Sequence, residues 1–598
     1  STLSANTVTV EAGRNVQITG GQLVSDQGTR IAAAGDLNID AATETRGERH
    51  LAATRSSGLL RSGLGVTLGS RELSVDGLTD STRAVASVVG STAGSLQIQA
   101  GKALRLTGSD LQAPSGDIAL QAPRIDIAEA RETLHTQTET RFRQSGITVA
   151  VSTPALTALQ TAQQMNRAAS QTADPRMKAL AAASTALSAY SAGQAIVAGQ
   201  GVTLPDGRTG QIVTGKDATG EPISRDATTA DRIGGINITV SAGSSRSVST
   251  QVVDSDTGRS SLVQAGRGVA ITARGGANDG TLNVRGSTLS AGTTLTLDAD
   301  NTLKLLAAQN QTTQTSTNQS TSGSIGVTAG SGGVGVTLSA SSGRGHSDGT
   351  DLSQLNTHLQ AGQDIDLRSG GDTTIKGAVG RATKISLEVG SNLNVESLQD
   401  HSKFNDKQEN IGGSITIGNG VAGGNFSYSK SKTDSDFASV TEQSGLRAGD
   451  QGFYINVENN ITLIGGAITS TQKAVSDNKN TLKSGGKLVM IDIQNRASYK
   501  ASGLGVSAGT GIRLDGKLAP QGTSAGFSNN NGNTSSTTTA TISDIAGNGA
   551  ARTGEAETGI TKIFDPDKTE TEIYAQMLIT QSFGREASKA VANYAEKK

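Results

Sequence analysis

A short phrase of alternating apolar and polar residues recurs along the chain. AGQDIDL begins at Ala361, and related phrases begin at Ala34, Ala100, Ala265, Ala291 and, less closely, Val389. Ile365 and Leu367 are two residues apart, so they share one face of a strand. Gly362 suits a tight turn with a positive φ angle. The pattern predicts strands of about three to five residues, bounded by Gly, Asn, Asp or Ser.

The spacing of these phrases indicates a coiled repeat. The glycines of neighbouring phrases lie 22 residues apart between Gly13 and Gly35 and 28 apart between Gly362 and Gly390. A period of about 20 residues with added loops is typical of a solenoid, whereas a β-sandwich has longer strands and larger core residues. The predicted fold is all-β: a right-handed parallel β-helix of about 17 rungs and about 80 Å, at about 4.8 Å per rung.

A second phrase interrupts the rungs. It consists of alternating strands around a Gly-rich turn, which is typical of a β-hairpin. In one copy Ile325 and Val327 precede the turn, and Val336 and Leu338 follow it. We expect these hairpins to project from the rod and to be able to pair with one another as a side sheet. The copies cover residues 57–77, 144–153, 234–250, 321–342, 411–436 and 501–531.

Two segments have helical rather than strand periodicity. Residues 153–198 carry apolar residues at helical spacing, with Pro154 at a first turn and Pro175 at a break, so we expect a helical hairpin projecting from the rod or packed on it. Near the end of the chain, Asp567 and Thr569 suit a helix start. That helix has an apolar stripe, and Gly584 is expected to separate it from a second helix.

These observations divide the chain into four parts. The last part is either a cap over the last rung or the beginning of a further domain. The predicted parts are 1–152 (rungs with a hairpin), 153–200 (helical hairpin), 201–545 (rungs with Gly-rich hairpins) and 546–598 (helical segment).

Composition supports an elongated fold with a thin core. The chain has 598 residues, 2% aromatics, 76 Gly and neither Trp nor Cys. A globule of this length needs large aromatics in its centre, whereas stacked rungs need only aliphatic side chains. The regular alternation of Val, Ile and Leu argues against disorder. We interpret Ser1, which lies in mid-pattern, as belonging to a piece of something larger.

Charge and cysteine content exclude several classes of partner and site. The 52 basic and 53 acidic residues are spread evenly, so no basic stripe predicts a nucleic-acid partner. The absence of Cys excludes disulfides and thiolate metal sites, and it fits an exported protein. The stretch from Leu180 to Leu204 is uncharged but too weakly hydrophobic for a membrane span.

Candidate catalytic motifs are weak. GxGxxG occurs at Gly330 and at Gly418, but strand patterning follows both copies, where a dinucleotide site needs a helix. The histidines lack metal-ligand spacing, and GRGHSDGTD (343–351) is expected to be a loop. We therefore assign no catalytic, cofactor-binding or metal site, no cofactor and no enzyme activity. The histidines are His50, His135, His346, His358 and His401.

The rung phrases, the Thr/Gln/Ser runs and the Gly-rich hairpins together resemble the filamentous haemagglutinin repeat region of two-partner-secreted exoproteins. The interrupted pattern is most similar to the second repeat block of contact-dependent growth inhibition effectors of the CdiA type. The resemblance covers about residues 5–545 and implies export by an outer-membrane transporter to the surface of a Gram-negative cell. In that family the second block is thought to lie at the target-cell outer membrane and to help deliver a C-terminal toxin. Residues 546–598 would then begin a pretoxin region.

One motif of that family stands in an unexpected place. VENN marks the toxin junction in many such effectors, and here it occupies Val457–Asn460. Alternation from Tyr454 to Ile464 places it inside a rung, and more rungs follow. We interpret this copy as a coincidence.

Three functions are compatible with these features. The first is a non-enzymatic delivery segment whose partners are the transporter and the target-cell outer membrane or its proteins, without nucleic acid or a small-molecule substrate. The hairpins at 321–342 and 411–430 would either form an amphipathic sheet in lipid or pad the flank of the rod. The second is the rod of an adhesin that binds a host or bacterial surface. The third, a polysaccharide lyase, is disfavoured because sugar grooves need clustered carboxylates and aromatic platforms.

Overall fold

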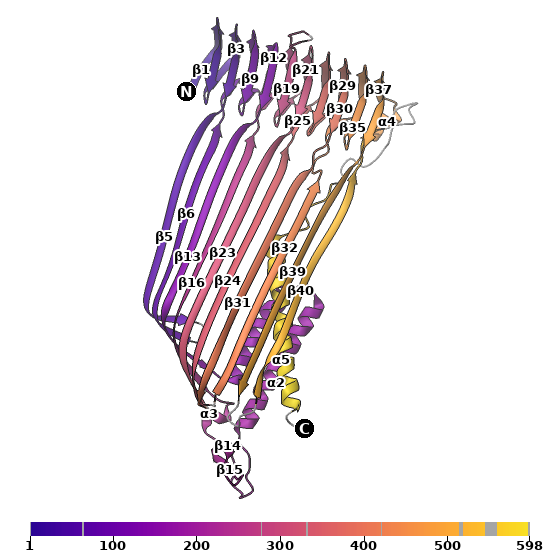
Figure 1. Cartoon of the computed structure of the whole chain (residues 1–598). Helices are drawn as coiled ribbons and strands as arrows, with labels where there is room; N and C mark the ends of the chain where they lie inside the picture. Colours follow the sequence, from indigo (N-terminus) through magenta and orange to yellow (C-terminus); the bar gives the residue numbers. More distant parts are fainter. Residues whose placement is uncertain are drawn as a thin grey trace.

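The protein is a rod of short rungs from which a sheet of very long strands extends toward a group of helices (Figure 1). The computed structural model describes residues 2–62, 65–276, 278–330, 333–419, 421–512, 518–543 and 559–595. The rod is a parallel β-helix, because all pairings between its rungs are parallel, as in Leu295 with Ile365 and Ile385.

Each full rung has three strands. Two belong to a 19-stranded parallel sheet, and one belongs to a 10-stranded parallel sheet. The strands of the larger sheet are β1 (Thr2–Ala12), β3 (Gln22–Ala33), β7 (Val88–Ser91), β8 (Ser95–Ala100), β10 (Asp110–Ala113), β11 (Ile118–Ala122), β17 (Leu262–Ala265), β18 (Val269–Ala273), β20 (Thr288–Ala291), β21 (Thr294–Ala299), β25 (Thr357–Ala361), β26 (Asp364–Ser369), β28 (Ala378–Ala382), β29 (Lys384–Val389), β33 (Gly445–Ala448), β34 (Phe453–Val457), β36 (Ala467–Thr469), β37 (Thr481–Ser484) and β41 (Thr541–Ile542).

The smaller sheet contributes one strand to each rung, so the number of its strands gives the number of rungs. Its ten strands are β2 (Val16–Thr19), β4 (Leu37–Asp40), β9 (Ala103–Thr107), β12 (Arg124–Ala128), β19 (Thr281–Arg285), β22 (Leu303–Leu306), β27 (Thr373–Lys376), β30 (Leu393–Glu396), β35 (Ile461–Ile464) and β38 (Leu488–Ile491). The ten rungs among the described residues, at about 4.8 Å each, give a rod of about 48 Å. The expectation of about 17 rungs is wrong, because the polar runs between rungs lie in the long strands instead.

The core of the rod is one continuous aliphatic column. Alternate side chains of most rung strands point inward, for example Ile365 and Leu367 of β26, which are 0% and 1% exposed. Phe453 is the one aromatic residue in this cluster of the described chain. The prediction of a thin aliphatic core is therefore confirmed.

The AG phrase serves two different corners of the rod. At Gly266, Gly292 and Gly362 it precedes a strand of the larger sheet, whereas at Gly35 and Gly101 it precedes a strand of the smaller one. Gly362 does not have a positive φ angle, contrary to our expectation. Glycine is needed there because a Cβ would lie 2.2 Å from the carbonyl oxygen of Gly292 in the rung below.

The long strands form a third sheet, of ten antiparallel strands. In sheet order they are β40 (Leu518–Thr538), β39 (Ile493–Ile512), β32 (Val421–Ser439), β31 (Asp400–Asn419), β24 (Gly333–Leu355), β23 (Ala308–Gly330), β16 (Asn237–Arg259), β13 (Ala130–Ser152), β6 (Gly65–Val85) and β5 (Ala42–Ser62). The expected side sheet is present, and its strands extend to the rod because the Thr/Gln/Ser runs are part of them. The segment 343–351, expected to be a loop, lies inside β24.

The hairpins leave the rod at every second rung. They depart after β4, β12, β22, β30 and β38 and return to the larger sheet, whereas the chain turns directly after β2, β9, β19, β27 and β35. A hairpin adds two strands at about 4.8 Å each, which equals the rise of two rungs. The long sheet can therefore remain continuous along the whole rod.

Two of the expected hairpins are instead the two strands of one hairpin. Residues 144–153 and 234–250 belong to β13 and β16, which pair from Ala130 with Arg259 to Ser152 with Asn237. The residues between these strands form an insertion at the far end of the sheet, so it neither projects from the rod nor packs on it, contrary to both of our expected arrangements. The insertion contains α1 (Pro154–Ser170), α2 (Pro175–Gly199), β14 (Gln211–Lys216), β15 (Pro222–Asp226) and α3 (Thr229–Arg232).

The inserted helices begin where the sequence predicts. Thr153 caps α1 by accepting a hydrogen bond from the Leu156 N–H (3.2 Å), and Asp174 caps α2 through the Arg176 N–H (2.8 Å). A short helix, α4 (Gln472–Ser476), lies beside the rod (Figure 1).

The C-terminal segment forms one helix rather than two. Helix α5 (Pro566–Ala595) continues through Gly584. A Cβ on Gly584 would lie 2.9 Å from Cβ of Ser524, so glycine allows the helix to approach β40. Helix α5 packs on β39 and β40 rather than over the last rung. Of the predicted segment 546–598, residues 546–558 and 596–598 lie outside the described residues.

Candidate functional site

The two faces of the long sheet differ in what they carry. Register places Leu59, Leu68, Ile147, Ala242, Ile325, Leu338 and Ile415 directly opposite one another on seven neighbouring strands, β5 to β31. Directly opposed residues of antiparallel strands point to the same side. We call this side the outer face. The other side is the helix-covered face, because α5 packs on it.

The far end of the outer face is apolar over three rows. We call this set the distal apolar band. Its side chains are between 41% and 77% exposed. Isolated exposed apolar residues are ordinary on a protein surface, whereas a continuous patch of them marks an interaction surface. The band consists of Leu59, Leu68, Ile147, Ile325, Leu338 and Ile415 in the first row, Val66, Val149, Val240, Val327, Val336 and Ile417 in the second, and Val151, Ile238 and Val334 in the third.

The height of the band is limited. Its first and third rows are four residues apart, as Ile147 and Val151 show, which is about 14 Å at about 3.4 Å per residue. A bilayer hydrocarbon core is about 30 Å thick. The band therefore matches about one leaflet and is too short to cross a bilayer.

The residues between the band positions carry small polar side chains on the opposite, helix-covered face. Their hydroxyls bond across strands: Thr67 with Thr148 (2.8 Å), Thr239 with Thr328 (2.9 Å) and Thr337 with Thr416 (2.8 Å). Cross-strand Thr pairs stabilise a sheet and leave few polar groups unsatisfied. The distal end of the sheet is thus amphipathic.

Helix α5 lies close to the sheet because glycines line its path. A Cβ on Gly505 would lie 3.0 Å from Cγ of Met577, and one on Gly503 would lie 3.1 Å from Cγ2 of Ile573. Larger side chains at these two glycines would push the helix away.

Two further groups hold the segment around α5 on the helix-covered face. Before α5, the Phe564 ring contacts Phe404 and Tyr499, with centroids 5.4 and 5.7 Å away. Beyond it, α5 joins α1 and α2 in a second small core that includes Met165 and Ile579.

A groove crosses the outer face beside the band. It has a volume of 960 Å³ and lies between Leu338, Ile411 and Phe426. Its floor is low because Gly413 and Gly424 have no side chain there. The surface therefore has a shallow, open apolar depression as well as ridges.

Basic side chains lie on the outer face on the rod side of the band. Arg55, Arg143 and Arg246 share one row with Glu72. The next row toward the rod includes Arg141, Arg344 and Lys430, with Glu409. The even distribution of charge along the sequence does not reveal this patch, because register brings together residues that are far apart in the chain.

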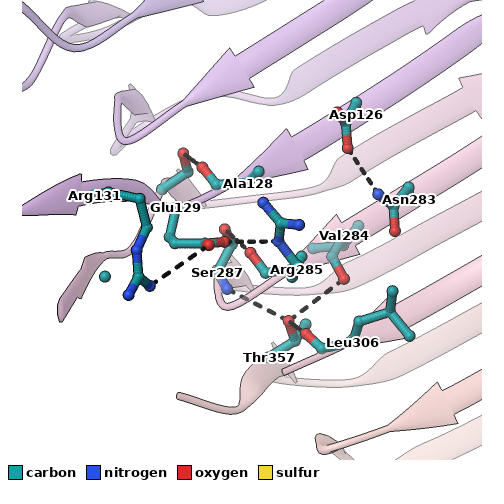
Figure 2. Close-up of polar contacts among 12 residues, drawn as sticks. Asp126, Ala128, Glu129, Arg131, Asn283, Val284, Arg285, Ser287, Leu306 and Thr357 are labelled. Atoms are coloured by element: carbon teal, nitrogen blue, oxygen red, sulfur yellow. Dashed lines mark hydrogen bonds and ion pairs between the residues drawn. The ribbon is translucent and has the colours of Figure 1, made fainter. Parts of the chain in front are cut away.

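Ionised side chains also brace the corner where the second hairpin leaves the rod (Figure 2). Glu129, between β12 and β13, is 6% exposed and lies 2.9 Å from Nε of Arg285 and 3.9 Å from Nη1 of Arg131. Arg285 belongs to the next rung and Arg131 to the departing strand. The carboxylate therefore ties the hairpin to the rod.

Buried hydroxyls form a column at the same corner. Thr357 Oγ1 donates to the Leu306 carbonyl (2.6 Å) and accepts from the Ser287 N–H (3.4 Å) (Figure 2). Ser109 Oγ likewise accepts from the Ser87 N–H, and Ser261 Oγ from the Ser109 N–H. Each hydroxyl satisfies backbone groups that the change of direction leaves unpaired.

Glu442 supports the corner of the fourth hairpin. It accepts hydrogen bonds from His358 Nε2 (2.9 Å) and Asn356 Nδ2 (3.0 Å), and Arg381 lies 3.5 Å away. These partners lower the pKa of Glu442 from its ordinary value to about 2, and the hydrogen bond from His358 has the largest effect. Burial acts in the opposite direction and raises the pKa.

The structure places the weak motifs on separate strands and at separate hairpin tips. Both GxGxxG copies lie at hairpin tips between strands, and Gly332 and Gly420 are outside the described residues. The five histidines lie on five different strands. Within the described ranges, no group of three or more His, Asp or Glu side chains is placed to hold a metal ion. Among the helices the structure describes, none is long and apolar enough to span a membrane.

The VENN segment lies in a rung, as predicted. Val457 ends β34 and Ile461 begins β35, so Glu458, Asn459 and Asn460 form the corner between them. Asn460 donates to Asn392 Oδ1 of the rung below (3.2 Å) and accepts from the Lys487 N–H of the rung above (2.9 Å).

The family model described as hemagglutinin repeat matches residues 1–145 and 240–411. The chain belongs to the haemagglutinin-repeat family. The match stops near the end of β13 and resumes at the start of β16, so the inserted helices lie outside it. The matched parts contain both rungs and hairpins, and the chain is a rod segment of the filamentous haemagglutinin and CdiA type.

Curated relatives are longer proteins. The chain is 33% identical to "tRNA nuclease CdiA" of Escherichia coli (strain NC101), over 91% of the chain and 16% of that protein. It is 32% identical to "Toxin CdiA" of Escherichia coli, over 100% and 19%. It is 31% identical to "Deoxyribonuclease CdiA" of Yersinia pseudotuberculosis serotype O:3 (strain YPIII), over 98% and 53%. The chain thus spans under a fifth of the first two and about half of the third. No solved structure matches it.

Proposed function

We propose that this chain is a non-enzymatic segment of a secreted contact-dependent growth inhibition effector, and that it binds the target-cell outer membrane and helps deliver a C-terminal toxin. The nuclease activities that give the relatives their names are activities of those proteins. The proposal further assigns export to a two-partner-secretion transporter and location to the surface of a Gram-negative bacterium. The observation that carries it is the distal apolar band.

The band is costly to keep in water and well suited to lipid. Fully burying one Leu, Ile or Val side chain contributes about 1.5 to 3 kcal/mol. Each side chain of the band is already partly covered, so burying the fifteen in acyl chains still gains on the order of 10 kcal/mol. Strands of the long sheet other than its two edges have their backbone groups paired, which lipid requires.

Vesicle flotation tests the proposal. The band variant changes Leu68, Ile147, Val149, Val240, Ile325 and Val327 to Ser. A matched control changes six exposed apolar residues outside the band, Leu51, Leu134, Val213, Ile223, Val489 and Ile491, to Ser. We expect the wild type and the control to float with outer-membrane vesicles and the band variant to remain in the dense fraction.

Protease protection supplies a second readout on the same samples. On vesicles, the far ends of the long strands should resist digestion while the rod side stays accessible. Flotation of the band variant at the wild-type level would contradict the proposal. The rod of a surface-binding adhesin would then be the better interpretation.

A further inference from the structure

We infer that the outer face carries a binding site for the phosphate group of an anionic membrane lipid, formed by Arg55, Arg143 and Arg246. The inference rests on the proposed membrane binding and adds the headgroup chemistry that is recognised. The site is a cavity of 380 Å³ on the rod side of the distal apolar band.

Three strands bring the arginines together. Register aligns Arg55 of β5, Arg143 of β13 and Arg246 of β16 in one row, with Glu72 of β6 between the first two. All three arginines are exposed, and they lie 88 and 103 residues apart in sequence. Guanidinium groups in this arrangement present several N–H donors to one phosphate.

Hydroxyl groups lie in the next row toward the band. Ser70, Ser145 and Ser244 line the same cavity, and the hydroxyls of Ser70 and Ser145 are 3.3 Å apart. Serine hydroxyls add neutral donors for phosphate oxygens. Gly323 extends this row without a side chain, which keeps the cavity open.

The protein neutralises the positive charge of the site only in part. Among described residues, none of the three arginines has an acidic partner within 4.0 Å. Glu72 supplies one negative charge to three positive ones in the row. An anion bound there would relieve repulsion between the guanidinium groups.

The position of the cavity selects a lipid as the source of the phosphate. From Arg143 to Ile147 the strand runs four residues toward the band, about 14 Å. A molecule that places a phosphate among the arginines can therefore lay acyl chains on Leu59, Leu68 and Ile147. A free phosphate or a nucleic acid would make no use of this apolar surface.

The experiment compares two kinds of vesicle. One contains phosphatidylcholine alone, and the other contains phosphatidylcholine with diphosphorylated lipid A. The test variant is Arg55→Gln/Arg143→Gln/Arg246→Gln. The control, Arg105→Gln/Arg267→Gln/Arg368→Gln, removes three arginines of the rod that are 61–69% exposed. We expect wild type and control to bind lipid A vesicles at least tenfold more tightly than phosphatidylcholine vesicles, and the test variant to lose this preference.

Several outcomes would overturn the inference. The test variant could retain the lipid A preference within twofold, or the wild type could bind both vesicles equally. Inorganic phosphate, added at the concentration of the lipid A phosphate groups and at constant ionic strength, could abolish the preference for lipid A vesicles. That result would indicate a site for free phosphate. Binding of the wild type to neither vesicle would instead contradict the proposed function itself.

A conservative variant separates recognition from folding. Arg55→Lys/Arg143→Lys/Arg246→Lys keeps the charges but not the bidentate geometry. It should retain part of the preference and weaken more steeply with salt. Circular dichroism and thermal unfolding should be unchanged in all three variants, because the altered side chains are exposed. Loss of the preference in the Lys variant as complete as in the Gln variant would contradict binding through charge.

Discussion

A left-handed glycine closes each rung corner that follows a strand of the smaller sheet and from which no hairpin leaves. These residues follow strands of the smaller parallel sheet and have φ angles from 52° to 66°: Gly20, Gly108, Gly286, Gly377 and Gly465. Where a hairpin departs, Ala41, Glu129, Ala307, Ser397 and Asp492 take this place. Glycine at this position therefore accompanies every direct turn in the described rungs, and another residue accompanies every departure of a hairpin. The rung strands could be predicted from alternation, but these corners could not, because the AG phrase does not mark them.

Replacing Gly286 with Ala should destabilise the rod. Gly286 has a φ of 52°, and a Cβ there would lie 2.7 Å from Cβ of Ala308. A left-handed non-Gly residue costs about 1 to 2 kcal/mol before the clash is counted. We expect a loss of about 2 to 4 kcal/mol in the free energy of unfolding, seen as a lower denaturant midpoint. Gly13→Ala is the control, since nothing lies within 4 Å of its added Cβ. Equal midpoints for both variants would contradict the role of the corner.

Glu442 should make the fourth hairpin corner sensitive to acid. Its folded pKa of about 2 lies below its ordinary value. Its stabilisation is therefore complete above the unfolded pKa of about 4.3 and is lost as the pH falls through about 2. Glu442→Gln should lower the free energy of unfolding by about 1 to 3 kcal/mol at pH 6 and by much less at pH 2. Urea denaturation of the wild type and the variant between pH 6 and pH 2 measures this difference in the free energy of unfolding. A difference that grows toward low pH would exclude this mechanism.

At the scale of elements, the alternation of plain and hairpin-bearing rungs determines the long sheet. The hairpin phrases in the sequence predicted a side sheet because their Val and Ile residues alternate. Their true length was missed, since runs such as 309–323 contain few apolar residues and look like linkers. The pairing of β13 with β16 was missed because 84 residues separate Ser152 from Asn237. Local patterns show that a strand exists but do not name a distant partner.

Deleting one plain rung should disrupt the sheet, whereas deleting two rungs with their hairpin should not. Leu262, Thr288 and His358 occupy equivalent positions in successive rungs. Removing 262–357 joins Ser261 to His358 and removes two rungs and two long strands together. Removing only 262–287 leaves two hairpins that depart from the rod one rung, about 4.8 Å, apart. Each hairpin has two strands and therefore needs about twice that spacing in the long sheet. We expect the first variant to unfold near the wild-type temperature and the second to unfold earlier or aggregate. The reverse order would refute the spacing rule.

At the scale of the whole molecule, the two faces of the long sheet differ. The outer face has an apolar far end, and α5 packs on the opposite face. The sequence revealed the apolar residues of the band, but the rows required the register of seven strands. The arginine row had a faint signal, because Arg-x-Ser-Gly followed by an apolar residue occurs at both Arg55 and Arg143. Arg246 lies on a strand of opposite direction and breaks that pattern. Charge read along the chain therefore suggested no patch, although the fold assembles one.

The final prediction concerns delivery by a complete effector that contains this chain. The six Ser substitutions of the band should leave export at the wild-type level, because they change neither the rod core nor the helix-covered face. Attachment to target cells should also stay at that level, because the proposal assigns the band to the later step of entering lipid and not to the first contact with the cell. Killing of target cells should fall at least tenfold, since the long sheet cannot place its far end in lipid without the band. The matched six-residue control should kill normally. Surface display is checked by protease shaving, attachment by cell sorting, and killing by survival counts. Loss of attachment together with killing would favour the adhesin interpretation, and normal killing by the band variant would show that delivery does not depend on this face.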